Sequence, residues 1–221
     1  MYRRSRSGRG SDKDMLKIGV MVSGGGTNLQ AILDRIDDGT LQNCRVVTVV
    51  SSKEGVYALE RAKSRGIPTA VISRKSFETI EEYDRALIEH MRRYQVELVV
   101  LAGFLSLLGE GFVTAWKNAI INVHPSLIPS FCGKGFYGIR PHQSALEYGV
   151  KVTGATVHFV DLEYDSGPII LQKAVEVCPG DTPETLQRRV MEQAEWIILP
   201  EAIKLFAEGR LKIIGRRVEI G

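Results

Sequence analysis

Apolar runs and amphipathic segments alternate along the first half of the chain. Continuous apolar runs are typical of strands buried on both faces of a parallel sheet, and apolar residues three or four positions apart are typical of helices. The expected strands cover residues 16–23, 45–51, 69–72, 98–101 and 119–124, and the expected helices cover 28–36, 58–65 and 81–94. This order predicts an α/β fold with a doubly wound, mostly parallel, Rossmann-like sheet.

The pattern changes after residue 130. The expected elements there are a polar, glycine-rich loop at 130–138, a helix at 141–148, and strands at 153–160 and 169–177 whose short connection favours antiparallel pairing. Thr182 and Pro183 predict the start of a long helix that reaches Phe206 and is interrupted or kinked at Pro200. We therefore predict one domain, residues 15–221, with a parallel N-terminal half and a mixed C-terminal half.

Composition and charge are those of an ordinary globular protein. Of the 221 residues, 44% are hydrophobic and 25% are charged, and the net charge is +3. Residues 1–14 supply this excess, because residues 15–221 hold equal numbers of acidic and basic side chains. The folded part therefore gives no argument for nucleic-acid binding. The Arg/Ser/Gly-rich segment 1–14 is predicted to be a disordered basic extension.

Several classes of protein are disfavoured by what the sequence contains. No apolar stretch approaches the roughly 20 residues of a membrane span, and no apolar region follows the basic start as a secretory signal requires. The three cysteines, Cys44, Cys132 and Cys178, are odd in number and widely spaced, which argues against a disulfide framework or a zinc site. We expect a cytoplasmic protein without a metal.

The apolar run 119–124 ends with two polar residues, Asn122 and His124, just before Pro125. Side chains on a strand alternate between faces, so the amide and the imidazole project to the same side. Such a pair can stabilise a developing oxyanion and move a proton, as acyl transfer requires. The alternative is a structural pair of hydrogen-bonded side chains at a strand end.

The segment Ser23-Gly24-Gly25-Gly26-Thr27-Asn28 connects the first expected strand to the first expected helix. Its backbone N–H groups and the helix N-terminus suit a phosphate group. It lacks the Gly-Lys-Ser/Thr of a P-loop, and no acidic residue closes the second strand to complete a dinucleotide motif. The pattern favours a phosphate monoester site, with a simple tight turn as the alternative.

The loop 161–168 contains three carboxylates without the spacing of a calcium loop. Asp161 and Glu163 fit a solvated turn. Asp165 precedes Ser-Gly-Pro, and a carboxylate held there near His124 would raise the pKa of the imidazole and orient its ring. His158, within a strand, is interpreted as structural.

Three motifs, Ser-Gly-Gly-Gly-Thr-Asn, Asn-Val-His-Pro-Ser-Leu-Ile-Pro and Asp-Ser-Gly-Pro, occur in this order. Together they resemble the phosphoribosylglycinamide formyltransferase family, folate-dependent enzymes of purine synthesis. The resemblance runs from about Leu16 to Leu211. The Asn-x-His-Pro-Ser-Leu motif is shared by other formyltetrahydrofolate enzymes, so it indicates the superfamily. Within that superfamily, the glycine-rich loop and the compact single domain favour the phosphoribosylglycinamide formyltransferase family.

The resemblance implies that the amine of glycinamide ribonucleotide attacks the formyl carbon of the cosubstrate 10-formyltetrahydrofolate directly. Asn122 would hold the oxyanion, His124 would stabilise the tetrahedral intermediate, and Asp165 would sustain the charge on His124 and align a water. The implied substrate contacts are Gly26, Thr27, Asn28, Glu192, Gln193, Ala194 and Glu195. The implied folate contacts are Leu105, Ser106, Leu107, Leu108, Asn122, Asp161, Leu162, Glu163, Tyr164 and Asp165.

Two positions depart from the resemblance. Relatives often have Arg where this chain has Ile80 and Ser106, so the contacts to the glutamate tail of the folate stay open, with Arg74 or Lys75 as candidate substitutes.

The closest alternative is a formyltetrahydrofolate hydrolase, which would use the same Asn, His and Asp to deliver water. Such enzymes usually carry an N-terminal regulatory domain, and residues 1–14 are too short to form one. Methionyl-tRNA formyltransferase would need a C-terminal RNA-binding domain. We expect small-molecule partners and neither nucleic acid nor membrane. A homodimer is left open.

Overall fold

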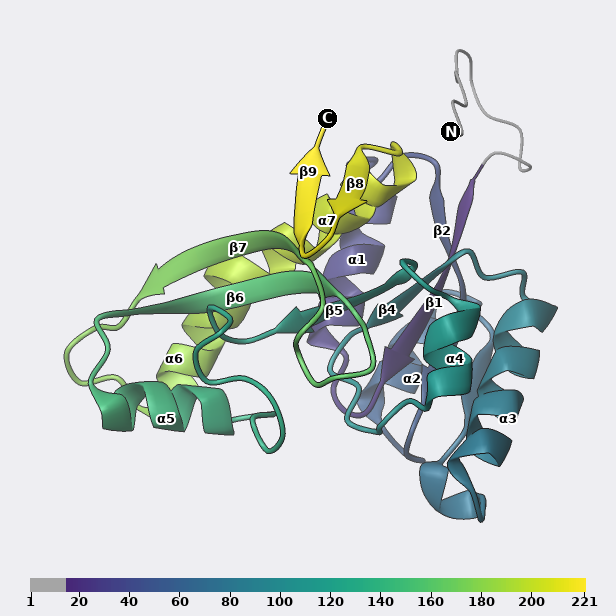
Figure 1. Ribbon diagram of the computed structural model, residues 1–221, viewed down its shortest axis with the longest axis horizontal. Helices are drawn as coiled ribbons and strands as arrows, with labels where there is room; N and C mark the ends of the chain where they lie inside the picture. Colours follow the sequence, from purple (N-terminus) through teal and green to yellow (C-terminus); the bar gives the residue numbers. More distant parts are fainter. Residues whose placement is uncertain (1–14) are drawn as a thin grey trace.

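The computed structural model describes residues 15–221, and the predicted disorder of residues 1–14 falls outside the described residues. Within this part of the chain, nine strands form one sheet in the order β3-β2-β1-β4-β5-β6-β7-β9-β8 (Figure 1). The strands are β1 (Leu16–Val22), β2 (Cys44–Ser51), β3 (Thr69–Val71), β4 (Leu98–Leu101), β5 (Ile120–His124), β6 (Val152–Phe159), β7 (Ile169–Glu176), β8 (Leu211–Ile214) and β9 (Arg217–Ile220). The first five are parallel, and β6 and β7 join antiparallel, which confirms the predicted mixed C-terminal half.

Helices cover both faces of the sheet. They are α1 (Thr27–Asp37), α2 (Tyr57–Lys63), α3 (Ile80–Arg93), α4 (Glu110–Ala115), α5 (Arg140–Tyr148), α6 (Pro183–Val190) and α7 (Trp196–Ala207), with short η2 (Arg74–Ser76) and η3 (Met191–Glu195) segments. One apolar cluster joins the sheet to α1, α2, α5, α6 and α7, and a second joins it to α3 and α4 on the other side (Figure 1). Residues 15–221 contain no helix that is long and apolar enough to cross a membrane.

The topology determines where a ligand can bind. The chain runs from β1 outward to β2 and β3, and then returns to β4 on the other side of β1. In doubly wound sheets, a crevice opens outside the carboxyl ends of the strands at such a switch point. The glycine-rich loop after β1 and the segment after β4 both lie at this edge, and β5 ends beside them.

Three features differ from the sequence-based expectation. The helix α4 and the hairpin of β8 and β9 were not predicted. The helix expected from Thr182 to Phe206 consists of α6, the π-helical η3 and α7. Its irregularity lies at residues 191–195, one turn before Pro200, and α7 continues through that proline.

Asp84 explains why α4 forms. This α3 side chain is only 3% exposed, and its carboxylate accepts hydrogen bonds from the backbone N–H groups of Gly109 (2.9 Å) and Phe112 (3.0 Å). These are N-terminal donors of α4, and the side chain of the N-cap residue itself makes no capping bond. An acidic residue of one helix therefore caps another that is 25 positions away.

Replacing Asp84 by Ala should destabilise the protein by about 3 kcal/mol, because two buried N–H groups lose a charged acceptor. The free energy of urea unfolding measures this. Asp34→Ala is the matched control, since it removes an exposed carboxylate paired with Arg65 and should cost less than about 1 kcal/mol. Equal losses in the two variants would contradict the capping role.

Candidate active site

The end of β5 places two polar side chains against β6. In the antiparallel register Asn122 pairs with His158 and His124 pairs with Thr156. The Asn122 amide Nδ2 lies 3.1 Å from His158 Nε2, and His158 Nδ1 lies 2.8 Å from the carbonyl oxygen of Phe159. The Asn122 amide and the His158 imidazole therefore belong to one polar network.

The network fixes how the Asn122 amide points. A backbone carbonyl can only accept, so His158 Nδ1 carries a proton and donates it to Phe159. In the neutral ring, Nε2 is then the acceptor for one N–H of Asn122, and the second N–H is directed to another acceptor. His158 was interpreted as structural from the sequence, but it lines the cavity and orients a predicted site residue.

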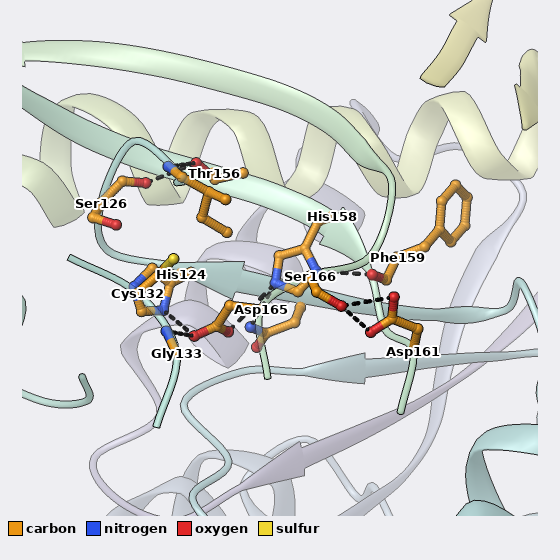
Figure 2. A network of polar contacts seen from close by, with 12 residues as sticks. His124, Ser126, Cys132, Gly133, Thr156, His158, Phe159, Asp161, Asp165 and Ser166 are labelled. Carbon is orange, nitrogen blue, oxygen red and sulfur yellow. Dashed lines mark hydrogen bonds and ion pairs between the residues drawn. The ribbon is translucent and has the colours of Figure 1, made fainter. Parts of the chain in front are cut away.

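Asp165 lies between the two histidine rings (Figure 2). Its Oδ2 is 3.5 Å from His124 Nδ1 and accepts a 2.8 Å hydrogen bond from the backbone N–H of Gly133, while its Oδ1 is 3.6 Å from His158 Nε2. Burial alone would raise the pKa of Asp165. The neighbouring rings of His158 and His124 and the Gly133 N–H outweigh burial and hold that pKa below its ordinary value. Asp165 is therefore ionised at neutral pH.

The loop that carries Asp165 is tightly constrained. Asp165 has a φ of 51°, a left-handed conformation that Asp adopts more readily than most non-glycine residues. The Ser166 hydroxyl donates to the Asp161 carboxylate, at 2.7 Å to Oδ1 and 2.9 Å to Oδ2. A Cβ on Gly167 would lie 1.8 Å from the Phe159 carbonyl oxygen, so only glycine fits there. Asp161 thus stabilises the loop, in addition to lining the cavity.

Burial has a larger effect on the charge state of His124 than Asp165 has. The ring is 4% exposed, and its burial lowers the pKa, which outweighs the opposite effects of Asp165 and of the Phe131 carbonyl. The increase expected from Asp165 is present, but burial outweighs it. Because His124 Nε2 lies 3.0 Å from the Phe131 carbonyl oxygen, the proton of the neutral ring is on Nε2. The unprotonated Nδ1 faces the Asp165 carboxylate.

A cavity of about 310 Å³ lies in front of this network. The predicted site residues that line it are Asn28, Leu105, Ser106, Leu107, Leu108, Asn122, His124, Asp161, Leu162, Glu163, Tyr164, Asp165 and Glu195. Those that do not line it are Gly26, Thr27, Glu192, Gln193 and Ala194. Ala194 is fully buried in the core, and Glu192 and Gln193 are exposed.

Other wall residues were missed by sequence reasoning. They include His158, Gln187, Met191, Phe136 and Tyr137. Gln187, Met191 and Glu195 are four residues apart and share one helix face. Because Glu195 was predicted, this spacing could have identified Gln187 and Met191. Phe136 and Tyr137 belong to the loop 130–138, where the sequence has no periodicity that assigns a direction to side chains.

Glu195 joins the glycine-rich loop after β1 to the opposite wall of the cavity, which η3 forms. Its Oε2 accepts a 2.7 Å hydrogen bond from Asn28 Nδ2 in the first turn of α1. Glu195 is the last residue of the π-helical η3, and the N–H of Trp196, which follows it, donates to the carbonyl of Met191. Such π-bulges are frequent at functional sites. Burial raises the pKa of Glu195 to about 7, although the Asn28 hydrogen bond acts in the opposite direction.

The glycine-rich loop ends at Gly26, the N-cap of α1, which has a φ of 73° and no side chain to cap the helix. At the other end, the Ser23 hydroxyl accepts a 2.9 Å hydrogen bond from the N–H of Leu105 and contacts the Ser52 hydroxyl at 2.6 Å. The loop after β1 is thereby joined to the segment after β4. Residues 15–221 contain no group of three or more His, Cys, Asp or Glu that could hold a metal ion.

Comparisons with known proteins agree on one family. The chain matches the Formyl transferase family over residues 16–203. It is 41% identical to a phosphoribosylglycinamide formyltransferase from Haemophilus influenzae, over 90% of this chain and 91% of that protein. The crystal structure of glycinamide ribonucleotide transformylase 1 from Symbiobacterium toebii superposes with a TM-score of 0.89, at 46% identity, and covers 97% of this chain and 99% of that one.

A further relative is much longer. The trifunctional purine biosynthetic protein adenosine-3 of Gallus gallus is 44% identical over 90% of this chain, but the chain spans only 19% of its length.

The raised pKa of Glu195 predicts a pH-dependent stability difference between the protein and Glu195→Gln. In the unfolded chain this carboxyl titrates near 4.5, and in the folded protein near 7, so folding disfavours its ionisation. The Gln variant should therefore be more stable than the wild type above pH 7, with an advantage that shrinks as the pH falls toward 4.5. Urea unfolding of both proteins between pH 4.5 and 8 measures this, and a pH-independent difference would contradict it.

Proposed function

Because the chain belongs to the formyl transferase family, we propose that it transfers the formyl group of 10-formyltetrahydrofolate to the amine of 5-phosphoribosylglycinamide. The product is N-formylglycinamide ribonucleotide, in de novo purine biosynthesis. The observation that carries this proposal is the convergence of Asn122, His124 and Asp165 on one cavity that also meets the helix following the glycine-rich loop.

The charge states of the site suit a direct attack by the amine. As the amine adds to the formyl carbon, negative charge develops on the formyl oxygen, and the second N–H of Asn122 donates to it. The neutral His124 accepts the proton that the amine loses, at the Nδ1 atom that faces the cavity-lining Asp165. The resulting imidazolium is stabilised by the ionised Asp165, and the proton passes on to the leaving nitrogen of the folate.

The two substrates bind on different walls. The backbone of the glycine-rich loop at Gly26 and Thr27 receives the phosphate, while Asn28 and Glu195 contact the rest of the acceptor nucleotide. The folate lies along residues 105–108 and the loop 161–165. Exposed apolar side chains on these two segments support this placement, because a flat aromatic ligand would cover Leu105, Leu107, Leu162 and Tyr164.

A formyltetrahydrofolate hydrolase would use the same three polar residues, so the acceptor distinguishes the two reactions. The roles of Glu192 and Gln193, a cytoplasmic location and a homodimer stay predictions.

Asn122→Ala and His124→Ala should each lower kcat by about 100-fold to 1000-fold, because one loses an oxyanion donor and the other loses the proton acceptor. The measurement is the 10-formyltetrahydrofolate-dependent consumption of 5-phosphoribosylglycinamide, with circular dichroism to verify that both variants are folded.

A reaction without the amine is the control. Tetrahydrofolate release at a similar rate in that control would favour the hydrolase. Near-normal turnover by either folded variant would disprove the assigned roles.

A further inference from the structure

We propose that Arg61, on α2, is a positioning residue for the phosphate of the acceptor: it holds the glycine-rich loop in its binding conformation and places a positive charge behind it. This inference rests on the proposed function and deepens it, because it concerns how the phosphorylated substrate is distinguished from its unphosphorylated counterpart.

The Arg61 guanidinium joins the loop to α1. Its Nε–H donates a 2.9 Å hydrogen bond to the Gly25 carbonyl oxygen, and its Nη1–H donates a 2.8 Å hydrogen bond to Gln30 Oε1. Gln30 lies in the first turn of α1, and its own backbone N–H bonds to the Gly26 carbonyl at 2.9 Å. One side chain therefore fixes both the loop and the helix start that follows it.

The direction of these bonds determines which loop atoms face a ligand. In a trans peptide the C=O of one residue and the N–H of the next point in opposite directions. The Gly24 carbonyl accepts from the Ala58 N–H of α2 at 3.2 Å, and the Gly25 carbonyl accepts from Arg61. The N–H groups of Gly25 and Gly26 are consequently turned away from α2. Donors arranged in this way at a helix start suit a phosphate.

Packing supports the same arrangement. A Cβ on Gly26 would lie 2.6 Å from Ala58 Cβ, so α2 approaches the loop as closely as glycine permits. The Arg61 guanidinium carbon lies 4.7 Å from the centroid of the Tyr57 ring, which restricts the side chain on its outer face.

The charge of Arg61 is available to an anion. Its partners are a backbone carbonyl, an amide oxygen and an aromatic ring, all of them neutral. Within residues 15–221, no carboxylate forms an ion pair with it. The nearby Arg65 is different, since it pairs with Asp34 at 3.3 Å and with Asp37 at 2.7 Å. A phosphate dianion at the loop would thus meet an uncompensated positive charge directly behind the Gly25 carbonyl.

The test compares two acceptors, 5-phosphoribosylglycinamide and the riboside that lacks the phosphate, in the wild type and in Arg61→Gln. We expect kcat/KM for the phosphorylated acceptor to fall about tenfold through a higher KM, with kcat and the KM for 10-formyltetrahydrofolate within about twofold. For the riboside, kcat/KM should change by less than about twofold. Arg61→Lys keeps the charge but not the two-point contact, and should lose about threefold for the phosphorylated acceptor only.

Arg65→Gln is the matched control, because it makes the same chemical change at another contact between the α2 region and α1. It should leave both acceptors within about twofold. Equal losses for the two acceptors in Arg61→Gln, or an equal effect of Arg65→Gln, would show that Arg61 has only a structural role and would overturn the inference. If Arg61→Gln does not fold, Arg61→Lys decides by the same comparison. A wild type that fails to formylate the nucleotide would overturn the proposed function itself, whereas an active wild type with unaltered Arg61 variants would overturn the role of Arg61 alone.

Discussion

The antiparallel pairing of β5 with β6 is the constraint on which the site depends. Successive side chains of a strand point to opposite faces of the sheet, so the register that pairs Asn122 with His158 also places His124 on the same side as Asn122. A shift of one residue would move these side chains to the opposite face. The connection after β6 folds back over β5 (Figure 1), and this brings the Asp165 carboxylate to both histidines. The polar network thus follows from strand pairing, turn geometry and one glycine without room for a side chain.

Burial then determines the charges within that geometry. An ionised carboxylate next to a neutral imidazole is stable here because Asp165 accepts a backbone N–H and lies beside a second histidine, whereas His124 is almost entirely removed from water. Transfer of a proton to His124 creates a close ion pair in a poorly hydrated environment, where the attraction is stronger than in water. Burial therefore keeps the resting His124 unprotonated and able to accept a proton, and the Asp165 carboxylate offsets part of the cost of charging the ring.

Much of this arrangement could be predicted from local sequence patterns. Buried strands, the glycine-rich turn and the Asn122–His124 pair each depend on neighbouring residues, so periodicity and turn chemistry suffice to find them. Features that depend on distant residues were missed: α4 needs the carboxylate of Asp84, and the place of His158 needs the register of β6. The net pKa of His124 could not be predicted, because the sequence identifies a charged neighbour but gives no measure of burial.

The two substrate walls are mechanically connected. Asn28, directly after the glycine-rich loop, is bonded to Glu195 across the cavity, and Ser23, directly before it, is bonded to the N–H of Leu105. A phosphate at the loop would therefore bind to a backbone that is already joined to Glu195 and to the start of the 105–108 segment. The π-helical η3 presents Glu195 to Asn28, and the neighbouring Ala194 is buried in the core. The acceptor wall at Glu195 and the start of the folate wall at Leu105 are consequently attached to opposite ends of one loop.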